Sequence, residues 1–336
     1  MLTPRMPTPH MPTPNMLTRR SIIAAGLLAP IAARAQTTSG NIVRIINPFA
    51  AGGSSDAMAR LLQPALQQSL GATVIVENRP GASASIGAAV VAKSPPDGTT
   101  WLLTSETFLV STLLLPNLPF DVQKDFEPVT MIARGPMVLC VHPSRPYRTL
   151  PELVAAAKAK PAALTYGTTG IGSNGHLTMA ALSQLTGMKL VQVPYRGAAP
   201  LLNDGTAGHV DMVISSSATV APQVETGQLR ALIQFGEQRA SFIPDTPTAI
   251  EQGITSLRAY SWFGFFGPAG TPKPLIDRFY KDVVAAMREE KTHGIFINKF
   301  RVDVPLPTPE ELRQSIVEGM PFWAKIIQDN NIKAGS

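Results

Sequence analysis

The sequence contains a single cysteine, Cys140, in 336 residues. One thiol excludes an intramolecular disulfide and a thiolate metal cluster. Beyond residue 35 the histidines also stand singly, with no pair spaced by four residues and none adjacent to the cysteine. They are His142, His176, His209 and His293. The sequence therefore predicts no metal site. Because Cys140 lies between apolar residues, we expect it to be a buried packing residue.

Charged residues are also few, because Asp, Glu, Lys and Arg make up 15% of the chain, against roughly 25% in typical soluble proteins. The formal net charge of +6 nevertheless raises the question of a nucleic-acid partner. Four of the basic residues fall within the first 35 positions, where no acidic residue occurs: Arg5, Arg19, Arg20 and Arg34. Residues 36–336 keep 25 basic and 23 acidic side chains, a net charge of +2 without a basic cluster. We therefore expect no nucleic-acid partner.

Apolar runs long enough to span a membrane are absent. The run 21–33 has 13 residues and contains Gly26 and Pro30, which is too short for a hydrocarbon core of about 30 Å. It follows two arginines and precedes Ala33-Arg34-Ala35. This order is typical of an export signal, and the preceding repeats of Met-Pro-Thr-Pro have low complexity.

We therefore interpret residues 1–35 as a low-complexity leader and signal peptide that is cleaved near Ala35. The mature protein is then expected in the periplasm, where a chain with one cysteine needs no disulfide. Both Met1 and Met16 stay open as the start of translation. The general and twin-arginine export routes also stay open, because the pair Arg19-Arg20 fits the second loosely.

Strand-like apolar runs alternate with segments of helical periodicity along the rest of the chain. The predicted strands are 41–46, 73–77, 100–104, 137–141, 164–166, 190–193, 210–214, 229–233 and 262–266. The predicted helices are 56–70, 86–92, 150–159, 177–185, a short one before 210, 274–289 and 309–329. This alternation predicts an α/β protein with mainly parallel sheets covered by helices on both faces.

The strands and helices form two series of similar length, which predicts two lobes. The chain crosses between them near 137–141 and 262–266, so lobe 1 would comprise residues 40–138 and 264–336 and lobe 2 residues 139–263. Open α/β sheets bind ligands beyond the carboxyl ends of their strands. We therefore expect the functional site in a cleft between the lobes.

One loop matches the dinucleotide fingerprint formally. Gly170-Ile-Gly172-Ser-Asn-Gly175 follows a predicted strand and precedes a predicted helix. A dinucleotide site also needs an acidic residue about 20 residues further on, and positions 186–196 contain none. No glycine-rich loop is followed by Lys and Ser or Thr, as a P-loop requires. No cofactor is expected.

Ser173 and His176 keep one enzymatic alternative open, an exported hydrolase acting on a small carboxylated substrate. No G-x-S-x-G elbow accompanies them. The two residues also share one predicted helix N-terminus, which suits capping better than nucleophilic catalysis. We therefore favour a binding protein without catalytic residues.

Two loops rich in Gly, Ser and Thr lead into predicted helices, one in each lobe. They are 51–55, before the helix at Asp56, and 168–173, before the helix near Asn174. Free backbone N–H groups and the positive end of the helix dipole make such N-termini suitable for anions. Capping by Ser54, Ser55 or Ser173 is the alternative interpretation. The several glycines favour close approach of a ligand to the backbone.

Five further side chains have open roles at this stage. Asp56 either contacts a ligand donor or stabilises the first turn of its helix. Arg196 either clamps a carboxylate or lies exposed on a turn. Tyr195 and Phe49 either wall the pocket or pack in the core. Asp211 is expected to hold a turn.

Several segments, taken together, resemble one known family. They are Pro48 to Asp56, Glu77-Asn-Arg-Pro-Gly-Ala82, Ile86-Gly87, Ala92 to Gly98, Tyr166 to Ser173 with His176-Leu177, Val193 to Gly197, and Gly264 to Pro272. In their order and spacing, over about residues 40–330, they resemble the Bug (TctC-like) family, the receptors of tripartite tricarboxylate transporters. Two positions depart from the family pattern, because Ser83-Ala84-Ser85 replaces a glycine pair and Thr99 replaces an aromatic residue.

The resemblance implies a two-lobed, type II periplasmic-binding-protein (Venus-flytrap) fold that closes on a small organic acid. The implied ligand-binding residues are Phe49, Ala51, Gly52, Gly53, Ser54, Asp56, Thr168, Gly170, Gly172, Ser173 and Tyr195. Ser105, Thr107 and Ser215 are added by topology, because they follow predicted strands. The implied partners are inner-membrane transporter subunits or a sensor kinase, and the protein is expected to be a monomer.

Overall fold

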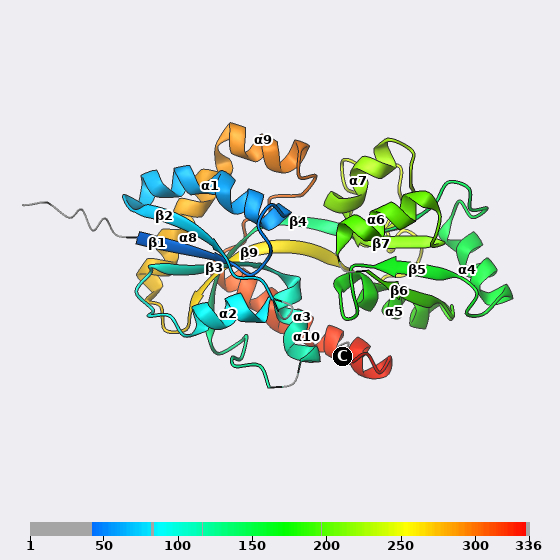
Figure 1. Ribbon diagram of the computed structural model, residues 1–336, viewed down its shortest axis with the longest axis horizontal. Helices are drawn as coiled ribbons and strands as arrows, with labels where there is room; N and C mark the ends of the chain where they lie inside the picture. Colours follow the sequence, from blue (N-terminus) through cyan, green and yellow to red (C-terminus); the bar gives the residue numbers. More distant parts are fainter. Residues whose placement is uncertain (1–41, 82–83, 116, 196, 334–336) are drawn as a thin grey trace, which may run out of the picture. The chain divides into compact units, whose positions relative to one another are not determined.

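The structure is a computed structural model that describes residues 42–81, 84–115, 117–195 and 197–333. The predicted leader, 1–35, and Arg196 lie outside these residues. Two groups of strands, each flanked by helices, form two lobes (Figure 1). No helix among the described residues is both long and apolar enough to cross a membrane.

The first lobe is built on a four-stranded group. β1 (Ile42–Asn47) lies parallel to both of its neighbours, β2 (Thr73–Asn78) and β3 (Thr100–Ser105). β9 (Tyr260–Pro268) runs antiparallel to β3. The helices of this lobe are α1 (Ser54–Leu70), α2 (Ser85–Ala92), α3 (Glu106–Leu114), α8 (Lys273–Arg288) and α9 (Glu290–Asn298).

Both faces of this sheet are buried, because its strands carry apolar residues at consecutive positions. Side chains alternate between the faces of a strand. Ile45 and Leu103 therefore join a core cluster with α1 and α8, whereas Ile46 and Leu102 join a second cluster with α2. Such continuous apolar runs are typical of sheets with helices on both sides.

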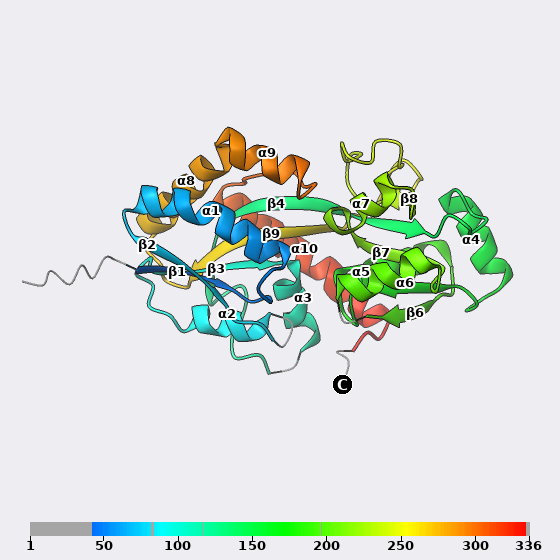
Figure 2. The same ribbon diagram turned by 45° about the horizontal axis from the view of Figure 1, so that its top comes forward.

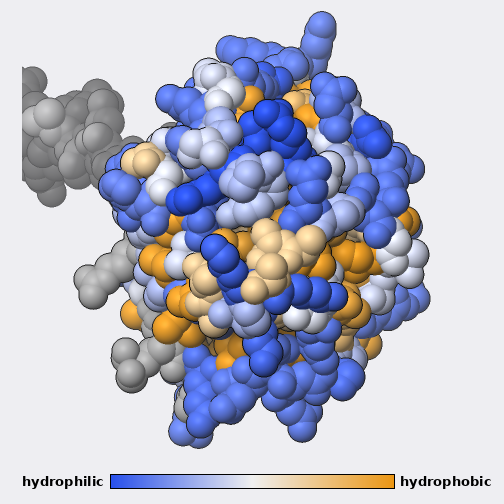
Figure 3. Space-filling view, turned by 90° about the vertical axis from the view of Figure 1, so that its right-hand side faces the viewer, coloured by the Kyte–Doolittle hydropathy of each residue, from blue (hydrophilic) through white to orange (hydrophobic). Residues whose placement is uncertain are grey.

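The second lobe is formed around the end of β4 (Phe126–Val141), which pairs antiparallel with β7 and with β8. Its strands are β5 (Thr165–Thr168), β6 (Val191–Pro194), β7 (Met212–Ser216) and β8 (Arg230–Gln234). Its helices are α4 (Leu150–Ala159), α5 (Asn174–Thr186), α6 (Ala198–Ala207) and α7 (Ser217–Glu225). Figure 3 faces this lobe from its outer end and shows a mainly hydrophilic surface with a hydrophobic band across its middle.

Cys140 confirms the prediction of a packing residue. It lies in β4 without solvent exposure and belongs to a core cluster with Leu201 and Val213. Burial raises the pKa of its thiol far above the ordinary value, so the thiol stays protonated and unreactive.

Two strands and one helix connect the lobes. Residues 126–136 of β4 pair antiparallel with β9, and residues 137–141 of the same strand pair with β7. α10 (Pro309–Asp329) contacts β4, α3 and α5 and runs from the first lobe to the second (Figures 1 and 2). Its Ile316 packs in a core cluster of the first lobe and its Ile327 in one of the second.

The predicted two-lobed α/β class is confirmed, and each predicted strand and helix overlaps an observed one. The sheets are mixed, because the crossing strands β4 and β9 run antiparallel to their neighbours. α3, α7 and α9 were not predicted. The assignment of 40–138 and 264–336 to one lobe and 139–263 to the other stays a prediction. The structure adds that α10 packs against the cores of both lobes.

Candidate functional site

A cleft of about 680 Å³ lies between the lobes. This volume is within the range of ligand pockets, which is about 300–1,000 Å³. From the first lobe and β9 the cleft is lined by Phe49, Ala50, Gly53, Ser54, Ser55, Ser105, Glu106, Thr107, Ser261 and Phe263. From the second lobe it is lined by Met137, Thr169, Ser173, Asn174, Gly175, Gly197, Ala198, Ala199, Pro200, Ser215, Ser216 and Thr219.

The N-termini of five helices meet in this cleft. Those of α1 and α3 belong to the first lobe, and those of α5, α6 and α7 to the second. Three of these helices have no side-chain hydrogen bond from their N-cap residues, which are Gly53, Gly197 and Ser216. Uncapped N–H groups together with the positive ends of the helix dipoles attract negative charge. The cleft is therefore suited to an anion.

The loop before α1 is held by a carboxylate that faces away from the cleft. Asp56 is 5% exposed, and its Oδ2 accepts a hydrogen bond from Gly52 N at 3.0 Å. Arg60 pairs with the same carboxylate at 3.1 Å. Hydrogen bonding to Arg60, more than the bond from Gly52, lowers the pKa of Asp56. Asp56 thus fixes the loop whose neighbouring residues, Gly53 and Ser54, line the cleft.

Ser105 and Ser173 cap the helices that they precede. The Ser105 hydroxyl accepts from Thr107 N at 3.3 Å, and the Ser173 hydroxyl accepts from His176 N at 3.3 Å. Capping is therefore confirmed for Ser173, whereas α1 begins at Ser54 after an uncapped Gly53. Both capping hydroxyls line the cleft and keep a donor hydrogen for a ligand.

The geometry of Ser173 and His176 does not match a nucleophile and its base. His176 Nδ1 accepts from Gly172 N at 3.1 Å, and the serine bonds to the His176 backbone instead of the ring. Burial lowers the pKa of the imidazole. Gly172 itself has a φ of +73°, and a Cβ there would lie 2.3 Å from Leu114 Cδ1. The positive φ favours glycine at this position, and a larger residue would also displace the end of the Leu114 side chain.

Glu106 is the single ionisable residue among the described residues that line the cleft. Its Oε2 accepts from Trp262 N at 2.9 Å. Burial raises the pKa of its carboxyl, and hydrogen bonds from Trp262, Ser261 and Asn174 oppose this effect. Asn174 in turn donates to Tyr260 O at 2.9 Å. Glu106 and Asn174 thus fasten one helix of each lobe to β9.

Aromatic side chains form one apolar part of the lining. Phe49 and Phe263 meet edge to face with ring centroids 6.4 Å apart. Both line the cleft, together with Met137. The cleft therefore offers hydrogen-bond donors for a polar end and aromatic surface for the apolar body of a ligand.

The structure places the predicted site residues in two groups. Those that line the cleft are Phe49, Gly53, Ser54, Ser105, Thr107, Ser173 and Ser215. Those outside the lining are Ala51, Gly52, Asp56, Thr168, Gly170, Gly172 and Tyr195. The Tyr195 hydroxyl bonds to Asp204 Oδ2 at 2.7 Å. Asp211, which was expected to hold a turn, instead connects distant segments, because it accepts from Thr165 N of β5 at 2.8 Å and pairs with Arg145 at 3.2 Å.

Several lining residues carry no recognisable signal in the sequence. The N-termini of α6 and α7 lack the repeated glycines that marked those of α1 and α5. Glu106, Met137 and Phe263 reach the cleft through tertiary placement alone. Among the described residues, no group of three His, Cys, Asp or Glu side chains is placed to hold a metal ion.

Two α/β lobes joined by crossing strands, with helix N-termini around the cleft, define a binding protein of the periplasmic-binding-protein fold. The solved structure of the periplasmic binding protein BugD is similar, with a TM-score of 0.74 and 29% identity over 88% of this chain and 99% of that one. An R. palustris protein, Rpa4515, solved with adipate, has a TM-score of 0.76 and 29% identity over 87% of this chain and 98% of that one.

The sequence comparisons identify the family. Protein BugT of Bordetella pertussis is 32% identical over 314 residues, which cover 93% of this chain and 95% of BugT. Residues 58–332 match the tripartite tricarboxylate transporter family receptor. The chain belongs to this family, and the resemblance found in the sequence is confirmed.

Proposed function

We propose that this chain is a periplasmic solute-binding protein that captures a small carboxylate in the cleft between its lobes. The observation that carries the proposal is the convergence of five helix N-termini, three without a side-chain cap, on one cleft. No Lys, Arg or His is among the described lining residues. Backbone N–H groups and the hydroxyls of Ser and Thr would therefore hold the anion, as charge-assisted hydrogen bonds.

The cleft also suits an elongated acid with an apolar segment. The aromatic pair Phe49 and Phe263 lies on the first-lobe side, and the N-terminus of α6 lies on the second. Rpa4515 was solved with adipate, an acid that combines two carboxylates with an aliphatic chain. A dicarboxylate of this kind would contact both lobes and stabilise their closed arrangement.

Closure around the ligand would give a membrane transporter a surface to recognise. Membership of the receptor family of tripartite tricarboxylate transporters supports uptake as the role. The predicted export signal supports the periplasm as the location. The family relationship supports binding without turnover, and the orientation of His176 away from the Ser173 hydroxyl agrees with this.

A thermal-unfolding screen of the mature chain tests the proposal. Mono- and dicarboxylates, including succinate, malate and adipate, are compared with sugars and divalent metal ions. A ligand at 100 times its Kd stabilises the folded state by about 2.7 kcal/mol, which is readily measured. We expect at least one acid to do so and to be recovered unchanged. Stabilisation by sugars or metals alone, or conversion of the acid to a product, would contradict the proposal.

A further inference from the structure

A second cavity, of about 180 Å³, lies beside the crossing strands, and α10 forms one of its walls. We call it the hinge cavity. It shares only Glu106 and Asn174 with the ligand cleft. These two side chains bond to the backbone of β9 at Trp262 and Tyr260. They therefore form a wall between the two spaces, and the hinge cavity is a separate site.

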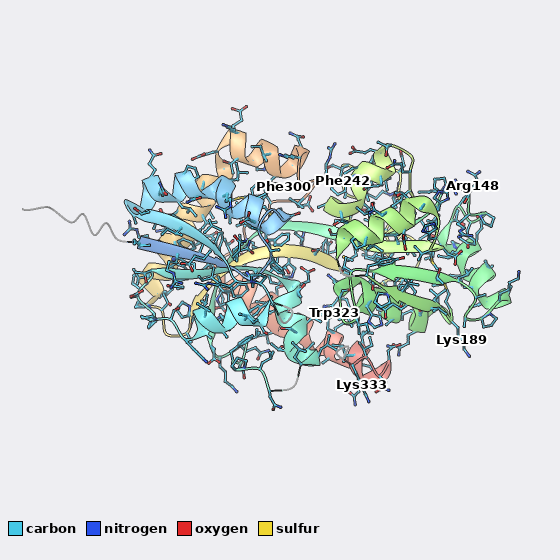
Figure 4. All side chains as sticks on the ribbon, viewed as in Figure 1. Arg148, Lys189, Phe242, Phe300, Trp323 and Lys333 are labelled. Atoms are coloured by element: carbon cyan, nitrogen blue, oxygen red, sulfur yellow. The ribbon has the colours of Figure 1, made fainter. Side chains whose placement is uncertain are left out.

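The wall formed by α10 is apolar apart from Ser315, and it leaves room. It presents Ile316, Met320 and Trp323 to the cavity. Figure 4 labels Trp323 on α10, in the region between the two groups of strands. Gly319 also lines the cavity, and a Cβ at this position would meet no atom within 4 Å. A cavity of about 150 Å³ holds a benzene ring in other proteins, so this space is large enough for one.

The opposite wall carries a guanidinium that has no hydrogen-bond or ion-pair partner among the described residues. Arg134 lies on β4, and its carbon Cζ stands 4.4 Å from the centroid of the Tyr260 ring. Its Nε is buried without a hydrogen-bond partner, and its side chain forms no ion pair among the described residues. A buried donor of this kind costs free energy unless a ligand or water accepts from it.

The charges around the cavity favour a single negative charge. Arg134 and Arg258 line it against one carboxyl, that of Glu106. Arg258 lies 3.4 Å from Glu237 and is partly neutralised by it. Arg134 also lines a neighbouring cavity together with Glu237 and Asp303, but it forms no ion pair with either among the described residues. Its guanidinium is thus left for an anion, and guanidinium groups bind carboxylates through paired hydrogen bonds.

We propose that the hinge cavity is a second ligand site, which takes a small monocarboxylate with a compact apolar body. The carboxylate would accept from Arg134, and the body would pack against Trp262, Met320 and Trp323. Benzoate is the probe of this chemistry, and benzamide is the neutral control of the same shape. This site is independent of the ligand in the cleft.

The tryptophans supply a local readout. The chain has three, of which Trp262 and Trp323 line the hinge cavity and Trp101 lies in the core of the first lobe. Benzoate should change the tryptophan emission of the mature protein and saturate at millimolar concentrations or below. Benzamide should bind at least about tenfold more weakly, because it cannot form charge-assisted bonds with Arg134.

Three variants assign the site. Gly319→Leu fills the cavity and should abolish the response, with Ser315→Met as a second filling variant if the first does not fold. Arg134→Met should weaken benzoate at least about tenfold and leave benzamide nearly unchanged. Ala199→Asp places a carboxylate on the lining of the cleft, at an exposed residue. It should leave benzoate binding in the hinge cavity unchanged.

Three results would overturn the proposal. The first is no response of the wild type to benzoate. The second is equal binding of benzoate and benzamide. The third is binding that survives Gly319→Leu and Ser315→Met but is lost in Ala199→Asp, since this would place benzoate in the cleft. Failure of the proposed cleft ligands in the thermal screen would leave this site untouched, so the two proposals fail separately.

Discussion

The cleft and the hinge cavity lie on opposite sides of Glu106 and Asn174. The two spaces differ in the groups that supply their positive charge. The cleft has helix N-termini and no basic side chain among its described lining residues. The hinge cavity has the guanidinium of Arg134 beside aromatic rings. Backbone dipoles are fixed by the fold and need little reorganisation when an anion binds. A guanidinium instead brings a full charge that must be paired when it is buried. The two proposed sites therefore differ in that the cleft would hold an anion without Lys or Arg, whereas the hinge cavity would use an arginine.

The largest expected effect is a loss of ligand affinity in the cleft when its positive potential is cancelled. Ala199→Asp adds a carboxylate in the first turn of α6. We expect the acid identified by the thermal screen to bind at least about tenfold more weakly, because like charges repel at short range. Calorimetric titration measures the change.

Ala199→Asn is the matched control, because it adds the same volume without the charge. Its affinity should stay within about threefold of the wild type. Neither variant should be less stable, since Asp and Asn are favourable near helix N-termini. If the Asp and Asn variants bound the acid with equal affinity, the helix N-termini would not set the charge preference of the cleft. The distinction drawn between the cleft and the hinge cavity would then be wrong.

The second effect concerns the cost of an unpaired arginine. Arg134→Met should change the free energy of unfolding by less than about 1 kcal/mol, because Arg134 has no side-chain hydrogen bond among the described residues and loses only its contact with the Tyr260 ring. Arg230→Met is the control. The Arg230 guanidinium donates to Pro143 O at 3.1 Å and to two further carbonyls at 3.4 Å. Its loss should destabilise the fold by about 1–3 kcal/mol.

Urea denaturation of both variants measures the difference. If Arg134→Met were destabilised as strongly as Arg230→Met, Arg134 would have a structural partner besides the Tyr260 ring. The hinge cavity would then lose the group that distinguishes it from the cleft.

The third effect is a change in the pH dependence of stability at the wall between the cavities. Burial raises the pKa of Glu106 in the folded state, above the value of about 4.3 in an unfolded chain. The folded state therefore prefers the protonated form. The stability that protonated Glu106 contributes is fully present below its pKa in the unfolded chain. It is lost as the pH rises through its pKa in the folded state.

Glu106→Gln should remove this loss. The variant should be more stable than the wild type at pH 7 and equally stable at pH 3, because the raised pKa disfavours the folded state only where the unfolded chain is ionised. Thermal unfolding between pH 3 and pH 8 measures the gain. A constant difference between the two proteins at all pH values would contradict a titrating Glu106.

The smallest effect is expected at the edge of the cleft. Asp56→Asn weakens the pairing with Arg60 and the bond from Gly52 N. We expect a loss of about 0.5–1 kcal/mol at neutral pH, because Arg60 is half exposed and the pair is screened by solvent. Hydrogen bonding to Arg60 lowers the pKa of Asp56. The stability that the Asp56 carboxylate contributes is therefore present above its pKa in the unfolded chain and is lost as the pH falls through its pKa in the folded state.

Denaturation of the wild type and Asp56→Asn at pH 7 and pH 2 checks this expectation. The two proteins should differ at the higher pH and converge at the lower one. The ligand affinity should fall at the same time, because the loop 50–53 positions the N-terminus of α1. A variant with unchanged affinity would show that the loop keeps its shape without Asp56.

The sequence was sufficient for the lobes and for the two glycine-marked helix N-termini. Short apolar runs, separated by segments of helical periodicity, identify β1, β2 and β3. Glycines before α1 and α5 mark loops that reach the cleft. α3 and α7 were missed because they are rich in Thr, Val and Ser, which have low helix propensity. Tertiary packing decides their structure instead.

Part of the site could not be read from the sequence for a related reason. Glu106 follows a strand as an ordinary polar residue, and only the contact with Trp262 N reveals that it is held in the wall. Asp56 stands in a family motif, yet it faces Gly52 N and Arg60 instead of the cleft. Motif position identifies a loop, whereas the direction of each side chain depends on the fold around it.

The most direct test of the account is calorimetric titration of residues 36–336 with the acid selected by the thermal screen and with its neutral amide. Helix N-termini that attract negative charge predict tight binding of the acid and at least about tenfold weaker binding of the amide. Equal binding of the two compounds would contradict the claim that the cleft recognises a carboxylate.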